Sequence, residues 1–265
     1  MAGDGGPIGR LMRRGAEAHW TRAAERVDQA DAAALRRERA RARSLRRALD
    51  RFLFAAEARL VAAASTSGPA APAAGTDWIW RPALSRGPLA VPGHAGADAG
   101  TRIGDEIALF HDSDLAELTA RQIRTAETGG APAPYALALD VFGFEGAYLS
   151  LALDMPEAAA QGLRKRHVVR ADLALHVERP VEVFVRLNVR HGPNTEQIVR
   201  ELPELDGPTS VEFDLAYSRL NERRVERMWL DIILDRPAMN RIELRDLTLS
   251  MRMMSRVMVK LRGLS

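Results

Sequence analysis

The chain has 265 residues, of which 46% are hydrophobic and 28% charged, and these values are ordinary for a globular protein with a sizeable core. It contains no cysteine, which excludes disulfides, thiolate nucleophiles and cysteine-ligated metals. The net charge of +3 is unevenly distributed, because residues 1–65 carry 14 arginines against 8 acidic side chains. Any attraction to a polyanion is therefore expected in this N-terminal segment.

The sequence offers no targeting or membrane-spanning signal. Its first twenty residues contain arginines but lack the apolar core of a secretory signal. No run approaches the ~18 consecutive apolar residues that cross a bilayer. The sequence therefore predicts a cytoplasmic protein with no transmembrane segment.

Residues 1–62 are predicted to form a basic helical arm, as one long helix or as a helix pair broken near residue 30. Alanine, arginine and leucine dominate the segment, and its apolar residues recur at the spacing of one helix face. They are Leu45, Leu49, Phe52, Ala56 and Leu60. Three partners remain open for this arm: its own body or a second copy, a polyanion or acidic protein on the arginines, or an anionic membrane surface.

The chain then changes composition. Residues 63–76 are small, with two prolines, and are predicted to be a linker. Beyond it, residues 77–252 are predicted to form one β-sandwich domain and residues 253–265 a basic tail. Trp78 and Trp80 fall on one face of an extended segment and are expected to pack against the core.

The stretch 104–114 is the most acidic of the chain, and His111 lies within it. Its carboxylates are Asp105, Glu106, Asp112 and Asp114. Calcium prefers several oxygen ligands, so calcium binding is one interpretation, but the EF-hand order is absent. Asp114 and Glu117 also fit a helix capping box, which we favour. That interpretation predicts a short helix from Leu115 to about residue 126.

From Tyr135 onward, apolar residues alternate with polar ones in seven segments separated by turn residues, which is the pattern of half-buried strands. The segments are 135–141, 149–153, 169–177, 181–189, 211–217, 228–234 and 242–249. In the last, apolar residues change from even to odd positions, which predicts a β-bulge near Arg245–Asp246. Together the segments predict a mainly β protein, an antiparallel jelly-roll-type sandwich with an N-terminal α-helical arm.

The segment 181–197 has a dry side of valine and leucine and a second side that carries charge, amide and ring. A ring offers stacking area and arginine and asparagine offer directed donors, which suits a glycan or an acidic ligand. The predicted ligand-binding residues are Phe184, Arg186, Asn188, Arg190, His191 and Asn194. Trp229 with Asp231, or Tyr148 with Ser150, would join them if their strands share that sheet. A wet face without a ligand is the alternative.

Several runs carry a resemblance to a known family. They are FGFEGAYLSLALDMPE, GLRKRHVVR, RLNVRHGPNTEQIVRELP, VEFDLAY and MWLDIILDRPAMNRIELRDLTLS. Through these runs the chain resembles an uncharacterised family of hypothetical alphaproteobacterial proteins. The resemblance covers residues 76–252 and implies no activity. The closing WLDIIL and IELRDLTLS are similar to the end of galactose-binding-like sandwiches of carbohydrate-binding modules, which implies that fold.

No motif in the sequence specifies a reaction, a cofactor or a metal. The six histidines lack paired ligand spacing, and no P-loop, G-x-S-x-G or G-x-G-x-x-G motif follows a strand. Asp231 and Asp235 lie four residues apart on one predicted strand, roughly 13 Å, which is too far for a glycosidase pair. We therefore predict a non-enzymatic binding or assembly module that binds carbohydrate through a sheet face. The alternative is an adaptor whose basic helix docks on a polyanionic or protein partner.

Overall fold

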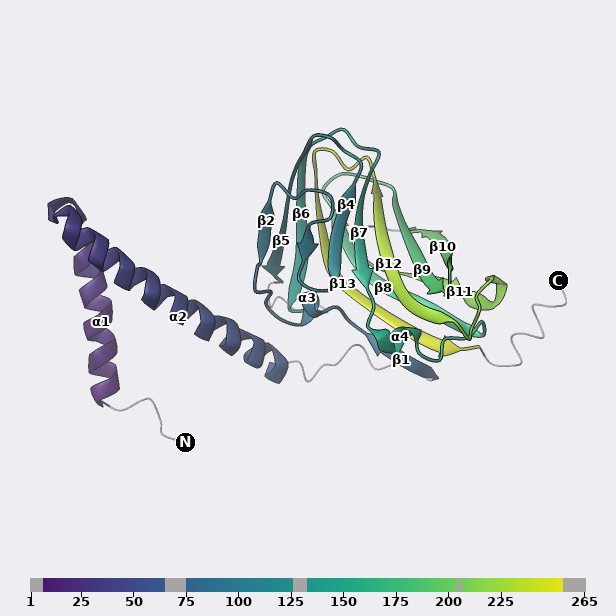
Figure 1. The fold of residues 1–265 in the computed structure, drawn as a ribbon, viewed down its shortest axis with the longest axis horizontal. Coiled ribbons are helices and arrows are strands. Elements are labelled where there is room, and N and C mark those ends of the chain that lie inside the picture. Colours follow the sequence, from purple (N-terminus) through teal and green to yellow (C-terminus); the bar gives the residue numbers. More distant parts are fainter. Residues whose placement is uncertain (1–6, 65–74, 126–132, 204, 206, 255–265) are drawn as a thin grey trace. The chain divides into compact units, whose positions relative to one another are not determined.

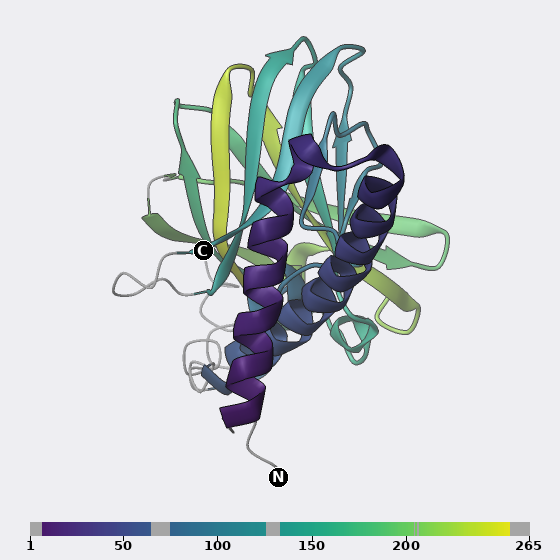
Figure 2. The ribbon, with the colours of Figure 1, turned by 90° about the vertical axis from the view of Figure 1, so that its left-hand side faces the viewer.

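The computed structural model describes residues 7–64, 75–125, 133–203, 205 and 207–254 (Figure 1, and turned by 90° in Figure 2). The chain divides into two compact units, residues 1–55 and 56–265. Most of the predicted linker, residues 65–74, and of the predicted tail, residues 255–265, lies outside the described residues.

The N-terminal unit is helical and is broken where the sequence predicted a break. Helix α1 (Pro7–Glu25) and the 3-10 turn η1 (Val27–Gln29) precede helix α2 (Ala32–Ala64). Asp31 begins α2, because its Oδ1 accepts hydrogen bonds from the backbone nitrogens of Ala33 and Ala34 at 2.8 Å. Within residues 7–64 and the other described ranges, no helix is long and apolar enough to cross a membrane.

The second unit is a sandwich of two sheets, in which every strand pair is antiparallel. Sheet A follows the order β11 (Gly207–Asp214), β8 (His167–Val177), β13 (Asn240–Met253), β6 (Tyr135–Phe144), β5 (Ala116–Arg124) and β2 (Gly93–Ala95), and β1 (Thr76–Trp80) also pairs with β13. Sheet B follows the order β10 (Asn194–Glu201), β9 (Val183–His191), β12 (Val225–Asp235), β7 (Tyr148–Asp154), β4 (Ile107–His111) and β3 (Arg102–Ile103). Short helices α3 (Ala83–Arg86), α4 (Glu157–Ala160) and η2 (Leu215–Tyr217) lie in the connections.

The facing sides of the two sheets form one hydrophobic core. The leucines and valines of alternate strand positions are buried there, such as Leu151 in β7, Val185 in β9 and Leu249 in β13. A face of apolar side chains removed from water is the main force that holds such sheets together. The mainly β, antiparallel sandwich predicted from the alternation is thus confirmed, and the predicted segments correspond to β6, β7, β8, β9, β11, β12 and β13.

One predicted element is wrong. Residues 115–126 were expected to be helical, but 116–124 form strand β5, paired with β2 and β6. The segment is rich in helix-forming residues, yet Leu118 and Ala120 alternate into the core, and pairing in the sheet outweighs local propensity. The capping box at Asp114 and Glu117 therefore does not form, since no helix begins there.

The predicted bulge in β13 is present and has a structural use. The pairing of β13 with β8 shifts register between Leu244 and Asp246, so both Leu244 and Leu247 face the core. At the bulge, Asp246 forms an ion pair at 3.1 Å with Arg81, the residue that follows strand β1. Trp78 and Trp80 stack at 6.4 Å between ring centroids and pack against the core, as expected.

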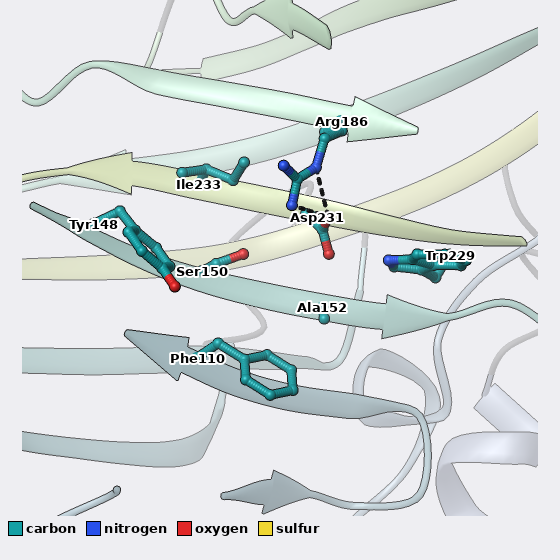
Figure 3. Close-up of a pocket in the computed structure, with 8 residues that line it drawn as sticks. All are labelled: Phe110, Tyr148, Ser150, Ala152, Arg186, Trp229, Asp231 and Ile233. Carbon is teal, nitrogen blue, oxygen red and sulfur yellow. Dashed lines mark hydrogen bonds and ion pairs between the residues drawn. The ribbon is translucent and has the colours of Figure 1, made fainter. Parts of the chain in front are cut away.

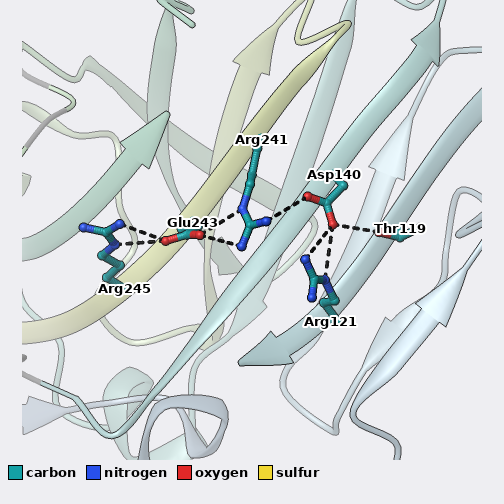
Figure 4. A network of polar contacts seen from close by, with 6 residues as sticks. All are labelled: Thr119, Arg121, Asp140, Arg241, Glu243 and Arg245. Carbon is teal, nitrogen blue, oxygen red and sulfur yellow. Dashed lines mark hydrogen bonds and ion pairs between the residues drawn. The ribbon is translucent and has the colours of Figure 1, made fainter. Parts of the chain in front are cut away.

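The outer face of sheet A carries a chain of alternating charges (Figure 4). Arg121 and Arg241 bind Asp140, and Glu243 accepts hydrogen bonds from Arg241 and Arg245 at 3.0 and 2.9 Å. Burial tends to raise the pKa of Glu243, but the two guanidinium groups outweigh it and leave the pKa below its ordinary value of 4.5. Burial dominates at Asp246 and raises its pKa despite Arg81.

These two carboxyl groups of β13 predict opposite effects of acid. The stabilisation from Glu243 is present above pH 4.5 and is lost as the pH falls through its lowered folded pKa. Asp246 binds its proton more tightly in the folded protein, so acid favours the fold at this position. In denaturant titrations across the acid range, Glu243→Gln should make the loss of stability shallower and Asp246→Asn should make it steeper. Parallel curves for both variants would contradict the assignment.

The core also predicts that the sandwich folds without the arm. Every buried residue of the hydrophobic cluster lies between Leu84 and Met251. A truncated protein that starts at Thr76 should therefore give a single cooperative melt, followed by calorimetry. Aggregation or a non-cooperative transition would mean that the helical segment completes the core.

A candidate ligand-binding groove on sheet B

The outer face of sheet B is shaped by an unusual row of side chains on β7. The residues that alternate with its buried leucines are Tyr148, Ser150, Ala152 and Asp154, so the middle of the row is small. Neighbouring strands place larger side chains beside it, since Phe110 pairs with Ser150 and Asp231 with Ala152. A floor of small residues with tall neighbours leaves a hollow.

This hollow has a volume of about 610 Å³, within the range of sites that hold small ligands (Figure 3). It draws its lining from the four neighbouring strands β4, β7, β12 and β9. The lining residues are Phe110, Tyr148, Ser150, Ala152, Arg186, Trp229, Asp231 and Ile233.

Aromatic rings surround the floor. Tyr148 and Phe110 are 39% and 43% exposed, which is high for such large apolar groups. Trp229 lies at the other end of the floor from Tyr148 (Figure 3). The guanidinium carbon of Arg227 lies 5.3 Å from the centroid of the Trp229 ring, a cation–π contact that fixes the indole and covers one of its faces. Exposed rings on a sheet face are suited to stacking against a ligand.

A buried carboxylate organises the polar side of the groove. Asp231 is only 4% exposed, and its Oδ2 lies 2.9 Å from Nε and 2.8 Å from Nη2 of Arg186. Asn188 donates to the same oxygen at 2.8 Å, and Gln197 donates to the Asn188 carbonyl at 2.9 Å. A buried charge requires such partners, because an unpaired one costs several kcal/mol.

The arrangement leaves specific groups available to a ligand. All three nitrogen contacts of Asp231 go to Oδ2, and its Oδ1 points away from Arg186 (Figure 3). The Arg186 side chain is still 34% exposed and lines the groove, so its guanidinium keeps N–H groups that a ligand can reach. The site thus combines rings, one acceptor oxygen and one guanidinium donor, a combination that binds a ligand with both apolar and hydroxyl or acidic parts.

Of the predicted ligand-binding residues, Arg186 lines this groove. Phe184 lies beside it, half-buried and paired with Ile233 of β12. Arg190 is on the same face but beyond the groove, where it forms an exposed ion pair with Glu226 at 3.3 Å. Both conditional pairs, Trp229 with Asp231 and Tyr148 with Ser150, do share the sheet and do line the groove.

The structure places three of the predicted residues outside the groove. Asn188 is fully buried, and its amide is hydrogen-bonded to Asp231 and Gln197 from the flanking strands, so it forms no part of the groove surface. His191 is 5% exposed and lies on the core-facing side of β9, where Nδ1 accepts a hydrogen bond from the backbone of Asn221. Asn194 is exposed at the start of β10, beyond the two-residue turn at Gly192, and outside the groove lining.

Three lining residues, Phe110, Ala152 and Ile233, were not predicted. Phe110 was hidden in the acidic stretch, although the alternation of Ile107 and Leu109 marks a strand there. The small residues of β7 were the available signal for a hollow, since a sheet face needs small side chains wherever it is concave.

The acidic stretch itself is divided by strand β4. Asp105 and Glu106 precede the strand, whereas Asp112 and Asp114 follow it, and Asp112 Oδ1 accepts a hydrogen bond from the backbone of Tyr148 at 3.1 Å. Among the described residues, no three histidine or carboxylate side chains gather where they could hold a metal ion. The structure therefore gives the calcium interpretation no cluster of carboxylate ligands in the described part of the chain.

The fold and the groove define a class, an antiparallel β-sandwich with an aromatic-lined groove on one sheet face. The chain belongs to the family described as "Family of unknown function (DUF6478)", whose model matches residues 1–257. No curated protein matches the sequence.

Comparison with solved structures finds carbohydrate-binding modules and a bacteriophage tailspike domain at low identity. A family 11 carbohydrate-binding module from Clostridium thermocellum, in complex with a beta-1,3-1,4-mixed-linked tetrasaccharide, is 10% identical with a TM-score of 0.37, over 60% of this chain and 96% of the module. A xylan-binding domain of family 22 is 11% identical with a TM-score of 0.35, over 69% and 97%. The enzymatically active domain of tailspike protein 4 from bacteriophage CBA120 is 6% identical with a TM-score of 0.38 over 62% of this chain, which spans about a fifth (21%) of that one.

The network predicts unequal roles for two arginines on one strand face. Arg186→Ala would leave the buried Asp231 carboxylate with Asn188 as its remaining partner, which should lower the free energy of unfolding by about 1.5–3 kcal/mol. Arg190 lies four residues further along the strand, and its ion pair is exposed. Arg190→Ala should therefore lower the free energy of unfolding by less than about 0.5 kcal/mol. Urea denaturation of the two variants measures both. Equal losses would show that Asp231 does not depend on Arg186.

Proposed function

We propose that the groove on sheet B binds a carbohydrate chain. The observation that carries this proposal is the placement of aromatic rings on three different strands around a floor of small residues. A pyranose ring presents a flat C–H face that packs on an aromatic ring, and its hydroxyl groups need acceptors and donors at the edge. Asp231 Oδ1 and the Arg186 guanidinium supply both.

The length of the groove favours an oligosaccharide over a single sugar. Tyr148 pairs with Asp235, and Trp229 pairs with Asp154 at the other end of β7. The two rings are thus six strand positions apart, roughly 20 Å along the strand direction. A ligand that contacts both rings must be extended. Because the groove is open on a sheet face, it can admit an internal stretch of a polysaccharide chain as well as a chain end.

We also propose that binding is not followed by hydrolysis. The usual glycosidases use two carboxyl groups about 5–9.5 Å apart, one of which must supply a proton. The groove lining includes the single carboxylate of Asp231, and this group already accepts three charged or amide nitrogen contacts on one oxygen. Such a carboxylate is suited to accept a hydrogen bond from a hydroxyl group, rather than to act as a general acid.

The test compares two aromatic residues of the groove with a tyrosine outside it. Affinity electrophoresis of the full chain against a panel of soluble plant and microbial polysaccharides should find at least one that retards it. Tyr148→Ala and Trp229→Ala should each weaken that retardation about tenfold, because a stacking surface is lost. Tyr217→Ala is the matched control, since this 78% exposed ring lies outside the groove. Failure of every polysaccharide, or equal loss in the control, would refute the proposal.

A further inference from the structure

Helix α2 carries a row of large apolar side chains that the rest of the N-terminal unit leaves uncovered. Leu45, Leu49 and Phe52 follow each other by four and three residues and so share one face, which Leu53 widens. They are 41%, 51%, 67% and 58% exposed. We call these four residues the apolar stripe. Exposed apolar groups in a contiguous row mark a surface that is covered by something else.

The remainder of this helix surface is strongly basic. Between residues 32 and 55 it holds Arg36, Arg37, Arg39, Arg41, Arg43, Arg46, Arg47 and Arg51. The acidic residues of that range are Glu38 and Asp50, and both are already paired: Glu38 with Arg41 at 2.9 Å, and Asp50 with Arg46 at 3.6 Å. The occupant of the stripe must therefore be apolar in the middle and negative around it.

A second copy of the helix does not satisfy this condition. Ala42, Leu45, Leu49 and Phe52 have the 3-4-3 spacing of a coiled-coil seam, and Arg41 and Arg46 flank it. In a parallel pair, Arg41 of one helix would face Arg46 of the other. In an antiparallel pair, the flanking positions that face each other hold arginine, alanine or leucine, so Arg41 and Arg46 gain no acidic partner from the second helix. Neither arrangement brings negative charge to the arginines, so a second copy does not complement the surface around the stripe.

We propose that α2 lies on the surface of a bilayer that contains anionic lipids. The apolar stripe enters the acyl boundary, and the arginines on the rest of the helix contact lipid phosphates and carboxylates. Long arginine side chains can reach the headgroups while their aliphatic parts lie along the apolar layer. A nucleic acid would satisfy the arginines but would leave Phe52 and its neighbours in water, so the stripe favours a membrane.

The decisive experiment is sedimentation of the full chain with lipid vesicles. Vesicles of phosphatidylcholine with one third phosphatidylserine should retain the protein at least about tenfold better than phosphatidylcholine alone, and added salt should reduce the difference. Phe52→Ser should lower partitioning about tenfold, because an inserted ring is lost. Phe54→Ser is the matched control: this 42% exposed ring lies nine residues from Leu45, half a turn round the helix, and its loss should change partitioning less than about twofold.

Other results would overturn the proposal. These are absence of binding to the anionic vesicles, equal binding to the neutral ones, and equal effects of Phe52→Ser and Phe54→Ser. Sedimentation equilibrium and a duplex DNA competition identify the alternatives. A dimer that Phe52→Ser dissociates would mean that the stripe binds a second copy, and DNA that displaces the protein while Phe52→Ser has no effect would mean that nucleic acid is the partner.

Discussion

The two-residue period of the strands is the constraint on which this sandwich depends. Because successive side chains point to opposite faces, a strand that supplies Leu149, Leu151 and Leu153 to the core must present whatever lies between them to the outside. The core and the groove are therefore formed by opposite faces of the same strands. A shift of one residue in the pairing of β7 would exchange leucines with the groove floor, so the packing of the core fixes the position of the groove.

The buried carboxylate of Asp231 adds a second level of order to this face. Its Oδ2 pairs with Arg186 and also accepts a hydrogen bond from Asn188, which in turn accepts one from Gln197. This network connects β10, β9 and β12 through side chains, in addition to their backbone pairing. Removal of one member takes a partner away from another, so these positions tolerate exchange less well than their polar nature suggests.

The sequence allowed prediction of the strands that alternate cleanly, and of the bulge in β13, because each depends on local residues alone. It failed at β5, where helix-forming residues pair in a sheet through contacts with distant strands. The groove was accessible only in part. Arg186, Trp229 and Tyr148 could be named, but the order β9–β12–β7–β4 joins segments that are not neighbours along the chain. The burial of Asn188 likewise depends on side chains from both flanking strands, which no local pattern reveals.

The groove has a consequence for the folding of the molecule. Its lining comes from residues 110, 148–152, 186 and 229–233, which are brought together only when the central four strands of sheet B have assembled. No short fragment of the chain can therefore hold it. Any molecule bound across these strands recognises the native state and not the unfolded chain, and so raises the melting temperature by mass action. Occupancy of the groove and folding of the sheet are therefore thermodynamically linked.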